Sequence, residues 1–200
     1  MVGVALVVVV LAALLGAKLL GFGAGPTSQD NQPVPAAVLT ALTQVPAAAF
    51  DAAGQGPNAN VPVRLPGPRW MTTDGKSQVL YIGSEYCPYC AGQRWPLIVA
   101  LSRFGQFSGL ALMTSAANDT FPSTPTFTFV HATYTSQYLS FSAVELQTNQ
   151  RQGTGYAPLQ KPTTEQQQRL DQYDKPPYTP AAAGSIPFLD VADTFMTSGT

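Results

Sequence analysis

The sequence predicts an α/β fold, in which helices flank a central β-sheet. Three observations support this prediction. Short apolar runs typical of strands alternate along the chain with helical patterns, which favours strands joined by crossover helices. Apolar residues make up 45% of the 200 residues, enough for a hydrophobic core. A Cys-x-x-Cys motif at residues 87–90 follows the clearest strand directly and opens the clearest helix.

The chain carries few charged residues. They make up 10% of the sequence, compared with roughly 25% in average soluble proteins. The net charge is −1 and there is no cluster of Lys and Arg. We therefore expect no nucleic-acid partner, because such binding depends on neutralising phosphates. Nor is there an acidic run that would indicate a strongly basic partner.

Residues 1–25 have the composition of a membrane segment. A helix over residues 2–23 would be about 33 Å long, close to the thickness of a bilayer core. A cleaved signal peptide is the alternative, but the apolar run is long for one. We expect a single-pass anchor in the cell membrane, with the domain outside the cytoplasm. No Lys or Arg precedes the span to support that orientation by the positive-inside rule.

A tether and short helices are expected over residues 26–70, before a domain at residues 71–200. The start of this segment is polar and contains Pro and Gly, which is typical of a linker. Helical patterns follow over residues 35–45 and 47–53. The remainder, residues 54–70, is rich in Pro and Gly and predicts a loop.

Within the domain, the helix after Cys90 carries apolar residues at every third position from Trp95 to Phe104 and should end at Gly105. Pro96 lies inside this helix and should kink it. Tyr81 and Trp95 are expected in the core. The other predicted elements are strands at 78–83, 110–115, 126–131 and 186–191, one or two strands at 134–146, a polar loop at 147–162, a helix at 164–173 capped by Thr164, and a Pro-rich loop at 175–185.

The chain's two cysteines, Cys87 and Cys90, fall within this one motif. A helix N-terminus presents unpaired N–H groups and about half a positive charge, which stabilises a thiolate on Cys87 and lowers its pKa. Pro88 fits the first turn, where its missing N–H costs nothing. Cys90 lies one turn further and should be shielded. It would then attack a mixed disulfide between Cys87 and a partner.

Three other uses of the pair remain open. A structural disulfide between Cys87 and Cys90 would close a loop too short to restrain the unfolded chain much. A zinc site needs four ligands, and the chain offers two Cys and one His. Copper could be bound by both thiolates with His131 or Met113. Thiol–disulfide exchange fits the motif better than any of these, so we expect no bound metal and no cofactor.

The order of these features resembles the thioredoxin fold. A strand runs into Cys-Pro-Tyr-Cys, a kinked helix follows, and an X-Pro pair opens a later strand. The motif is similar to that of glutaredoxins and of some periplasmic disulfide isomerases. This resemblance implies that Cys87 is the nucleophile and Cys90 the resolving cysteine. It also implies that Pro187 is a cis-proline facing the dithiol, and that the backbone of Ile186 pairs with bound substrate.

The chain is also similar to a bacterial and archaeal family known only as domain of unknown function 929, whose members look like membrane-anchored thioredoxin-like proteins. Far more residues separate Cys90 from Pro187 than a minimal thioredoxin unit needs, which implies an insertion including the predicted 164–173 helix. A thioredoxin domain would continue through a last strand and a closing helix, so the chain looks truncated at its C-terminus. The similar segments are residues 79–110, 124–145 and 186–195.

Residues beside the cysteines complete the candidate site. Glu85, two residues before Cys87, could shuttle the proton of Cys90, although a carboxylate there would also raise the pKa of Cys87. Tyr86 and Tyr89 could form an apolar platform for a partner's side chains. Further candidates for the proton transfer are Glu145 and Asp190.

We therefore expect a membrane-anchored enzyme that exchanges thiols and disulfides through Cys87 and Cys90. Its partners would be proteins or small molecules that carry thiols or disulfides. Two alternatives come from other functional classes. One is a copper-binding or delivery module that uses the two cysteines and His131. The other is a non-catalytic thioredoxin-like interaction domain in which the dithiol is incidental.

Overall fold

The computed structural model describes residues 30–54, 62–68, 72, 74–180 and 183–199. The described residues fall into two units, one made of residues 46–54 and the other of everything else. The first unit contains one helix, α3 (Ala47–Ala53), which ends at Gly54 as predicted. The anchor predicted at residues 2–23 lies outside the described residues.

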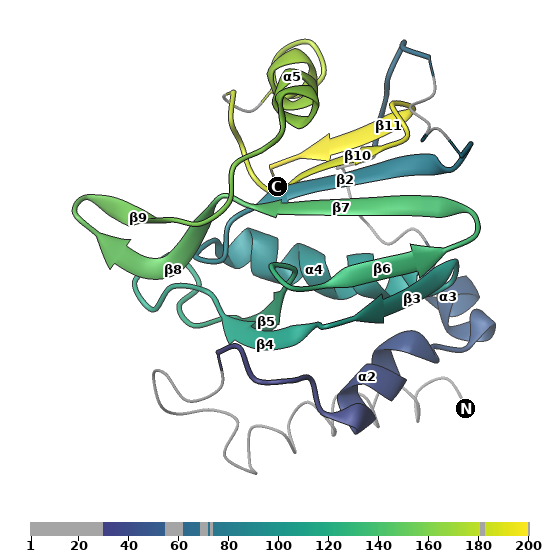
Figure 1. Ribbon diagram of the computed structural model, residues 1–200, viewed down its shortest axis with the longest axis horizontal. Coiled ribbons are helices and arrows are strands. Elements are labelled where there is room, and N and C mark those ends of the chain that lie inside the picture. The colour runs from purple at the N-terminus through teal and green to yellow at the C-terminus, as the bar shows by residue number, and fades with distance from the viewer. Residues whose placement is uncertain (1–29, 55–61, 69–71, 73, 181–182, 200) are drawn as a thin grey trace. The chain divides into compact units, whose positions relative to one another are not determined.

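The larger unit contains the elements that position the candidate site (Figure 1). Its helices are α2 (Ala36–Thr43), α4 (Pro88–Leu101) and α5 (Thr164–Tyr173). Its strands are β1 (Val63–Arg64), β2 (Ser77–Gly83), β3 (Gly105–Ser108), β4 (Ala111–Thr114), β5 (Pro125–Thr128), β6 (Thr133–Ser136), β7 (Leu139–Glu145), β8 (Gln147–Gln152), β9 (Gly155–Pro158), β10 (Phe188–Val191) and β11 (Phe195–Ser198).

In the part of the chain that the structure describes, no single helix has the length and apolar composition needed to cross a membrane. The consecutive short helices α2 and α3 meet these criteria only as a broken pair.

Five of the strands form a mixed sheet in the order β1-β11-β10-β2-β7. Strands β2 and β7 are parallel, whereas β2–β10, β10–β11 and β11–β1 are antiparallel. Three two-stranded ladders, β3–β6, β4–β5 and β8–β9, complete the described strands. A mixed α/β architecture with a central sheet and flanking helices is thus confirmed.

Strand β2 lies between β10 and β7, and both of its faces are covered. Val79 and Tyr81 point into one hydrophobic cluster, together with Leu97 and Ile98 of α4. Leu80 and Ile82 point into a second cluster, which includes Leu170 of α5. Side chains alternate between the two faces of a strand, so α4 and α5 cover opposite faces of the sheet (Figure 1). This double burial explains why β2 reads as one continuous apolar run.

Helix α4 begins at the cysteine motif and packs on the sheet through buried Leu97, Ile98 and Leu101. Pro96 lies inside it, as predicted. The extension of its apolar face to Phe104 is wrong. The helix ends at Leu101, and the chain turns into β3, which leaves Phe104 51% exposed.

Three predictions around α5 and the C-terminus are wrong. The polar loop expected at residues 147–162 contains the β8–β9 hairpin. Strand β8 is polar on both faces and gives no apolar alternation to recognise, and β9 is only four residues long. No strand was expected after residues 186–191, but β11 follows β10 and pairs with it antiparallel. It follows a turn in which Ala192 and Asp193 both have φ of 55°, so the Gly and Asn typical of such turns are absent. The loop expected at residues 54–70 contains β1, which pairs with β11.

Helix α5 is confirmed over its full predicted length, but its N-cap is Thr163 rather than Thr164. The Thr163 side chain accepts a hydrogen bond from the backbone N–H of Gln166, whose side chain accepts one from the backbone N–H of Thr163. The Ile186–Pro187 peptide bond is cis, as predicted.

Candidate functional site

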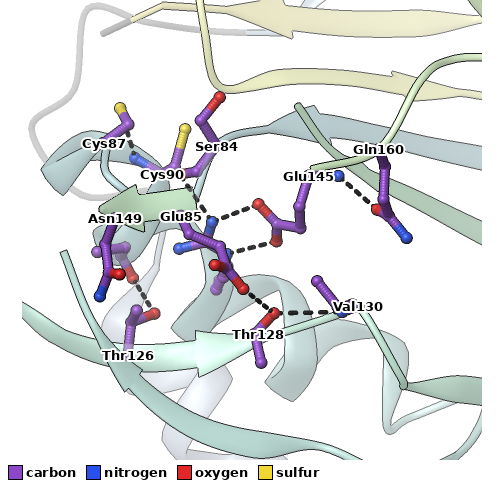
Figure 2. Close-up of polar contacts among 12 residues, drawn as sticks. Ser84, Glu85, Cys87, Cys90, Thr126, Thr128, Val130, Glu145, Asn149 and Gln160 are labelled. Atoms are coloured by element: carbon purple, nitrogen blue, oxygen red, sulfur yellow. Dashed lines mark hydrogen bonds and ion pairs between the residues drawn. The ribbon is translucent and has the colours of Figure 1, made fainter. Parts of the chain in front are cut away.

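The two cysteines lie at the start of α4, where β2 delivers the chain into the helix. Cys87 is the N-cap residue, and its Sγ accepts a hydrogen bond from the backbone N–H of Cys90 at 3.3 Å. Pro88 occupies the first turn, as predicted. Both thiols are free, and Figure 2 shows the two sulfurs pointing to the same side. Cys87 is 5% exposed and Cys90 0%, so solvent reaches Cys87 first.

The two thiols differ in how readily they lose a proton. A hydrogen bond from the Cys90 thiol lowers the pKa of Cys87 to about 7, with smaller contributions from the backbone N–H groups of Cys90 and Tyr89. Burial raises the pKa of Cys90 well above its ordinary value, and its hydrogen bond to Cys87 raises it further. Just above neutral pH the two cysteines therefore carry one proton between them, and it is on Cys90. The more exposed sulfur becomes the thiolate, which is the form that attacks disulfides.

A buried ion pair lies beneath the cysteines. Arg94 donates two hydrogen bonds to Glu145, from Nε at 3.0 Å and from Nη2 at 2.6 Å, and Nη2 also donates to the carbonyl of Ser84 at 3.0 Å. All three residues are fully buried. This arrangement ties α4 to the end of β7 and to the turn that leads into the motif. The positive charge of Arg94 also lowers the pKa of both cysteines.

Sequence reasoning missed Arg94. Arginine on a helix is usually exposed, and its partner Glu145 is 51 residues away. One signal was available, because Arg94 lies four residues after Cys90 and hence on the same side of the helix.

Glu85 is buried, and its carboxylate accepts a hydrogen bond from the hydroxyl of Thr128 at 2.7 Å. Its backbone N–H donates to the carbonyl of Gln147. Burial raises the pKa of its carboxyl. In Figure 2 the carboxylate of Glu85 points toward Thr128 and away from the two sulfurs. This geometry favours a link between the motif and β5 over direct contact with Cys90.

Most of the chain matches a known protein family. The model of the family described as domain of unknown function (DUF929) matches residues 67–197, more than half of the chain. The chain belongs to the DUF929 family. No curated protein and no solved structure matches it.

Aromatic side chains surround the motif of this DUF929 domain. Tyr86 stacks on Tyr156 of β9, with ring centroids 4.1 Å apart. Tyr89 is 40% exposed and makes an edge-on contact with Phe121, at a centroid distance of 5.7 Å. The β8–β9 hairpin and the loop after β4 therefore both reach the cysteine motif. Neither contact was predicted, because both partners are distant in sequence.

Pro187 and Ile186 come immediately before β10. The ladder pairs Phe188 with Ile82, so Pro187 lies beside the end of β2 from which the chain enters the motif. Pro187 is buried and Ile186 half-buried. In this DUF929 domain the cis-proline therefore lies directly before β10, the strand next to β2, which leads into the cysteine motif.

Two other predicted candidates lie apart from the dithiol. His131 is exposed in the turn after β5. Asp190 is buried on β10, where it faces Arg169 of α5 and accepts a hydrogen bond from the N–H of Asp193. Across the described residues of this DUF929 domain, no group of three or more His, Cys, Asp or Glu side chains is arranged to bind a metal ion.

Proposed function

We propose that this DUF929 protein is a thiol–disulfide oxidoreductase in which Cys87 is the nucleophile and Cys90 the resolving cysteine. The observation that carries the proposal is the arrangement at the start of α4. There the Cys87 sulfur accepts the N–H of Cys90, and its pKa is lowered to about 7 while burial raises that of Cys90. A dithiol divided in this way has one attacking sulfur ready near neutral pH and keeps the second protonated in reserve.

The exchange proceeds in two steps. The Cys87 thiolate attacks one sulfur of a partner disulfide, forms a mixed disulfide, and releases the partner's other sulfur as a thiolate that takes up a proton. Cys90 then loses its proton and attacks the Cys87 sulfur, which releases the second partner thiol and leaves a Cys87–Cys90 disulfide. The partner gains two electrons and the dithiol loses two. The reverse sequence oxidises a partner dithiol.

The arrangement of the elements supports a thioredoxin-like fold. A buried strand ends at the motif, a helix begins with the nucleophilic cysteine, and a cis-proline precedes the neighbouring antiparallel strand. The β8–β9 hairpin and α5 then form the insertion before that strand. We also propose that residues 2–23 anchor the protein in the cell membrane with the domain outside the cytoplasm, where the partners would be cysteine-containing proteins or small thiols.

The first test traps the mixed disulfide. The Cys90→Ala variant of the full chain should accumulate adducts with cellular proteins through Cys87, visible on non-reducing gels and absent after reduction, because the resolving step is removed. The Cys87→Ala/Cys90→Ala variant is the matched control and should show none. Absence of adducts, together with a Cys87 pKa near the roughly 8.5 of free cysteine, would refute the proposal.

The second test is the pH dependence of alkylation. The rate of Cys87 modification by iodoacetamide should rise with an inflection near pH 7, the lowered pKa of this thiol. In Cys90→Ala the inflection should move to higher pH, because the thiol hydrogen bond is the largest cause of the lowering. An inflection that stays in place would mean that Cys90 does not stabilise the thiolate.

A further inference from the structure

Tyr81 places an unexplained hydroxyl in the interior beneath the dithiol. It lies in the middle of β2 and is 0% exposed. Its hydroxyl has no hydrogen bond of ordinary geometry among the described residues. An unpaired buried hydroxyl costs about 1–3 kcal/mol, and phenylalanine would fill the same space without that cost. Packing alone therefore does not explain why this position carries a tyrosine.

The phenol ring lies between β2 and α4. A Cβ atom added to Gly83 would lie 2.3 Å from the Tyr81 hydroxyl oxygen, so the ring runs along β2 toward the end that leads into the motif. The guanidinium carbon of Arg94 is 5.8 Å from the ring centroid. The Cys90 thiol lies close enough to the hydroxyl for hydrogen bonding between them to influence its pKa. The Tyr81 ring thus lies near Arg94, and its hydroxyl lies near Cys90.

The groups around Cys90 are hydrogen-bond donors. Burial raises the pKa of Tyr81 well above its ordinary value, so its hydroxyl keeps its proton and can donate it in a hydrogen bond. Burial by itself lowers the pKa of Arg94, but the opposing charge of Glu145 outweighs this effect and raises the pKa, so Arg94 stays cationic. Its Nη1 also has no partner among the described residues. A neutral thiol gives the Tyr81 hydroxyl little to bind, whereas a thiolate would accept its hydrogen bond and would also be stabilised by the charge of Arg94.

We propose that Tyr81 is a positioning residue for the resolving step, and that its hydroxyl donates a hydrogen bond to the Cys90 thiolate while the charge of Arg94 supports it. This inference rests on the proposed function. In the step, Cys90 gives up its proton and forms a bond to the Cys87 sulfur as the bond from Cys87 to the partner breaks. The departing partner thiolate takes up one proton. Tyr81 keeps its own proton throughout, and no further reactant is needed.

The role differs from the one expected for Glu85. A carboxylate would accept the proton of Cys90, whereas Tyr81 stabilises the charge that remains after the proton has left. The Glu85 carboxylate is engaged by Thr128, and its direction in Figure 2 is away from the sulfurs. The donors that act on Cys90 come instead from β2 and α4.

The test separates the two steps of the exchange. The reduced full chain is mixed with the aromatic disulfide 5,5′-dithiobis(2-nitrobenzoate) and release of the coloured thiol is followed by stopped-flow absorbance. The first release reports attack by Cys87, and the second reports resolution by Cys90. In Tyr81→Phe the second release should slow at least tenfold and its pH inflection should rise, because one hydrogen bond to a charged group is lost. The first release should change less than twofold.

Tyr134→Phe is the matched control. Tyr134 packs against the same hydrophobic cluster as Tyr81, but its hydroxyl donates to the carbonyl of Leu101 at 2.8 Å. Its loss should lower the free energy of unfolding and leave the ratio of the two release rates unchanged. Tyr81→Phe should show the opposite pattern, with normal or greater stability and a slow second release.

Two results would overturn the inference. An unchanged second release in Tyr81→Phe would do so while leaving the proposed function intact, and so would a slow second release in Glu85→Gln with a normal one in Tyr81→Phe. A wild-type protein that releases no coloured thiol through Cys87 would instead overturn the proposed function, and this inference with it.

Discussion

At the residue scale, Gly83 leaves the space that the Tyr81 side chain occupies beneath the cysteine motif. A side chain there would collide with the hydroxyl oxygen of Tyr81 at 2.3 Å and with its ring carbon at 2.6 Å. Tyr81 is fully buried between the sheet and α4, so it has little room to move. The absence of a side chain at this position is what lets the phenol reach the end of β2.

Replacing Gly83 with Ala should therefore destabilise the protein by about 1–3 kcal/mol, the usual cost of overpacking a core. Urea unfolding of the full chain measures this. Gly92→Ala is the matched control, because Gly92 lies in α4 with nothing within 4 Å of an added Cβ. It should stabilise the protein by up to about 1 kcal/mol. Equal stability of Gly83→Ala and wild type would contradict the position of Tyr81.

Individual residues differ in how far the sequence predicts them. The positions of Cys87, Pro88 and Cys90 follow from local rules for helix N-termini, and all three lie where the sequence placed them. Arg94 and Glu145 could not be paired in advance, because only the parallel packing of β7 on β2 brings Glu145 to the level of Gly83. Contacts made across a sheet leave no trace in local spacing.

At the scale of elements, α5 is held both at its start and through its middle. Its N-terminus is closed by the capping box of Thr163 and Gln166. Arg169, in the middle of the helix, faces the buried Asp190 and the neighbouring Asp193 in the β10–β11 turn. These contacts attach the helix to the strand that follows the cis-proline.

Thr163→Ala should lower the free energy of unfolding by about 1 kcal/mol, because the first turn loses an N-cap acceptor. Thr164→Ala removes the neighbouring hydroxyl, which is exposed and makes no capping bond, and should have little effect. Denaturant unfolding of both variants distinguishes the two positions. Greater destabilisation by Thr164→Ala would restore the cap predicted from the sequence.

The attachment of α5 should also depend on pH. Burial raises the pKa of Asp190 from its ordinary 3.8 to about 6, an effect to which the charge of Asp193 adds and which Arg169 opposes. Between these values the folded protein binds more protons at this site than the unfolded chain, so its contribution to stability falls as pH rises from about 4 to 6. Asp190→Asn keeps an acceptor for the N–H of Asp193 but cannot ionise. Its Tm should fall less than that of wild type over this range; parallel curves would exclude Asp190 as the source.

Strands β1, β3, β8, β9 and β11 were not predicted. In the β8–β9 hairpin, β8 is polar on both faces, and its strand character comes from pairing with β9 rather than from burial. Strand β11 is short and begins after a turn without Gly or Asn. By contrast, β2, α4 and α5 carry strong apolar periodicity or clear caps, and their positions were predicted within a few residues.

At the scale of the whole larger unit, β2 is the strand on which the rest depends. It pairs with β10 on one side and β7 on the other, and both faces are buried. The mixed α/β class follows from the alternation of patterns in the sequence. The strand order does not follow from the sequence pattern, because that pattern does not show which strand pairs with which.

Hydrogen exchange should show that β2 is more stable than the peripheral strands. Amides of Val79–Ile82 should exchange most slowly, since their strand opens only when the whole sheet does. Amides of the β8–β9 hairpin, whose residues are mostly exposed or half-buried, should exchange much faster. Mass spectrometry of peptic fragments measures both. Comparable rates in the two segments would mean that the hairpin and the sheet unfold as one cooperative unit.

The distance in sequence between Arg94 and Glu145 has a consequence for biosynthesis. The carboxylate that holds Arg94 in place is encoded 51 residues after it, so at about 5–20 residues per second the ribosome completes it roughly 3–10 seconds later. Until then, the emerging cysteines lack the ion pair that ties α4 to the sheet, and the charge of Arg94 that lowers the pKa of both thiols is not held beside them. The buried surroundings of the pair are thus complete only once the chain as far as the end of β7 has been made and can fold.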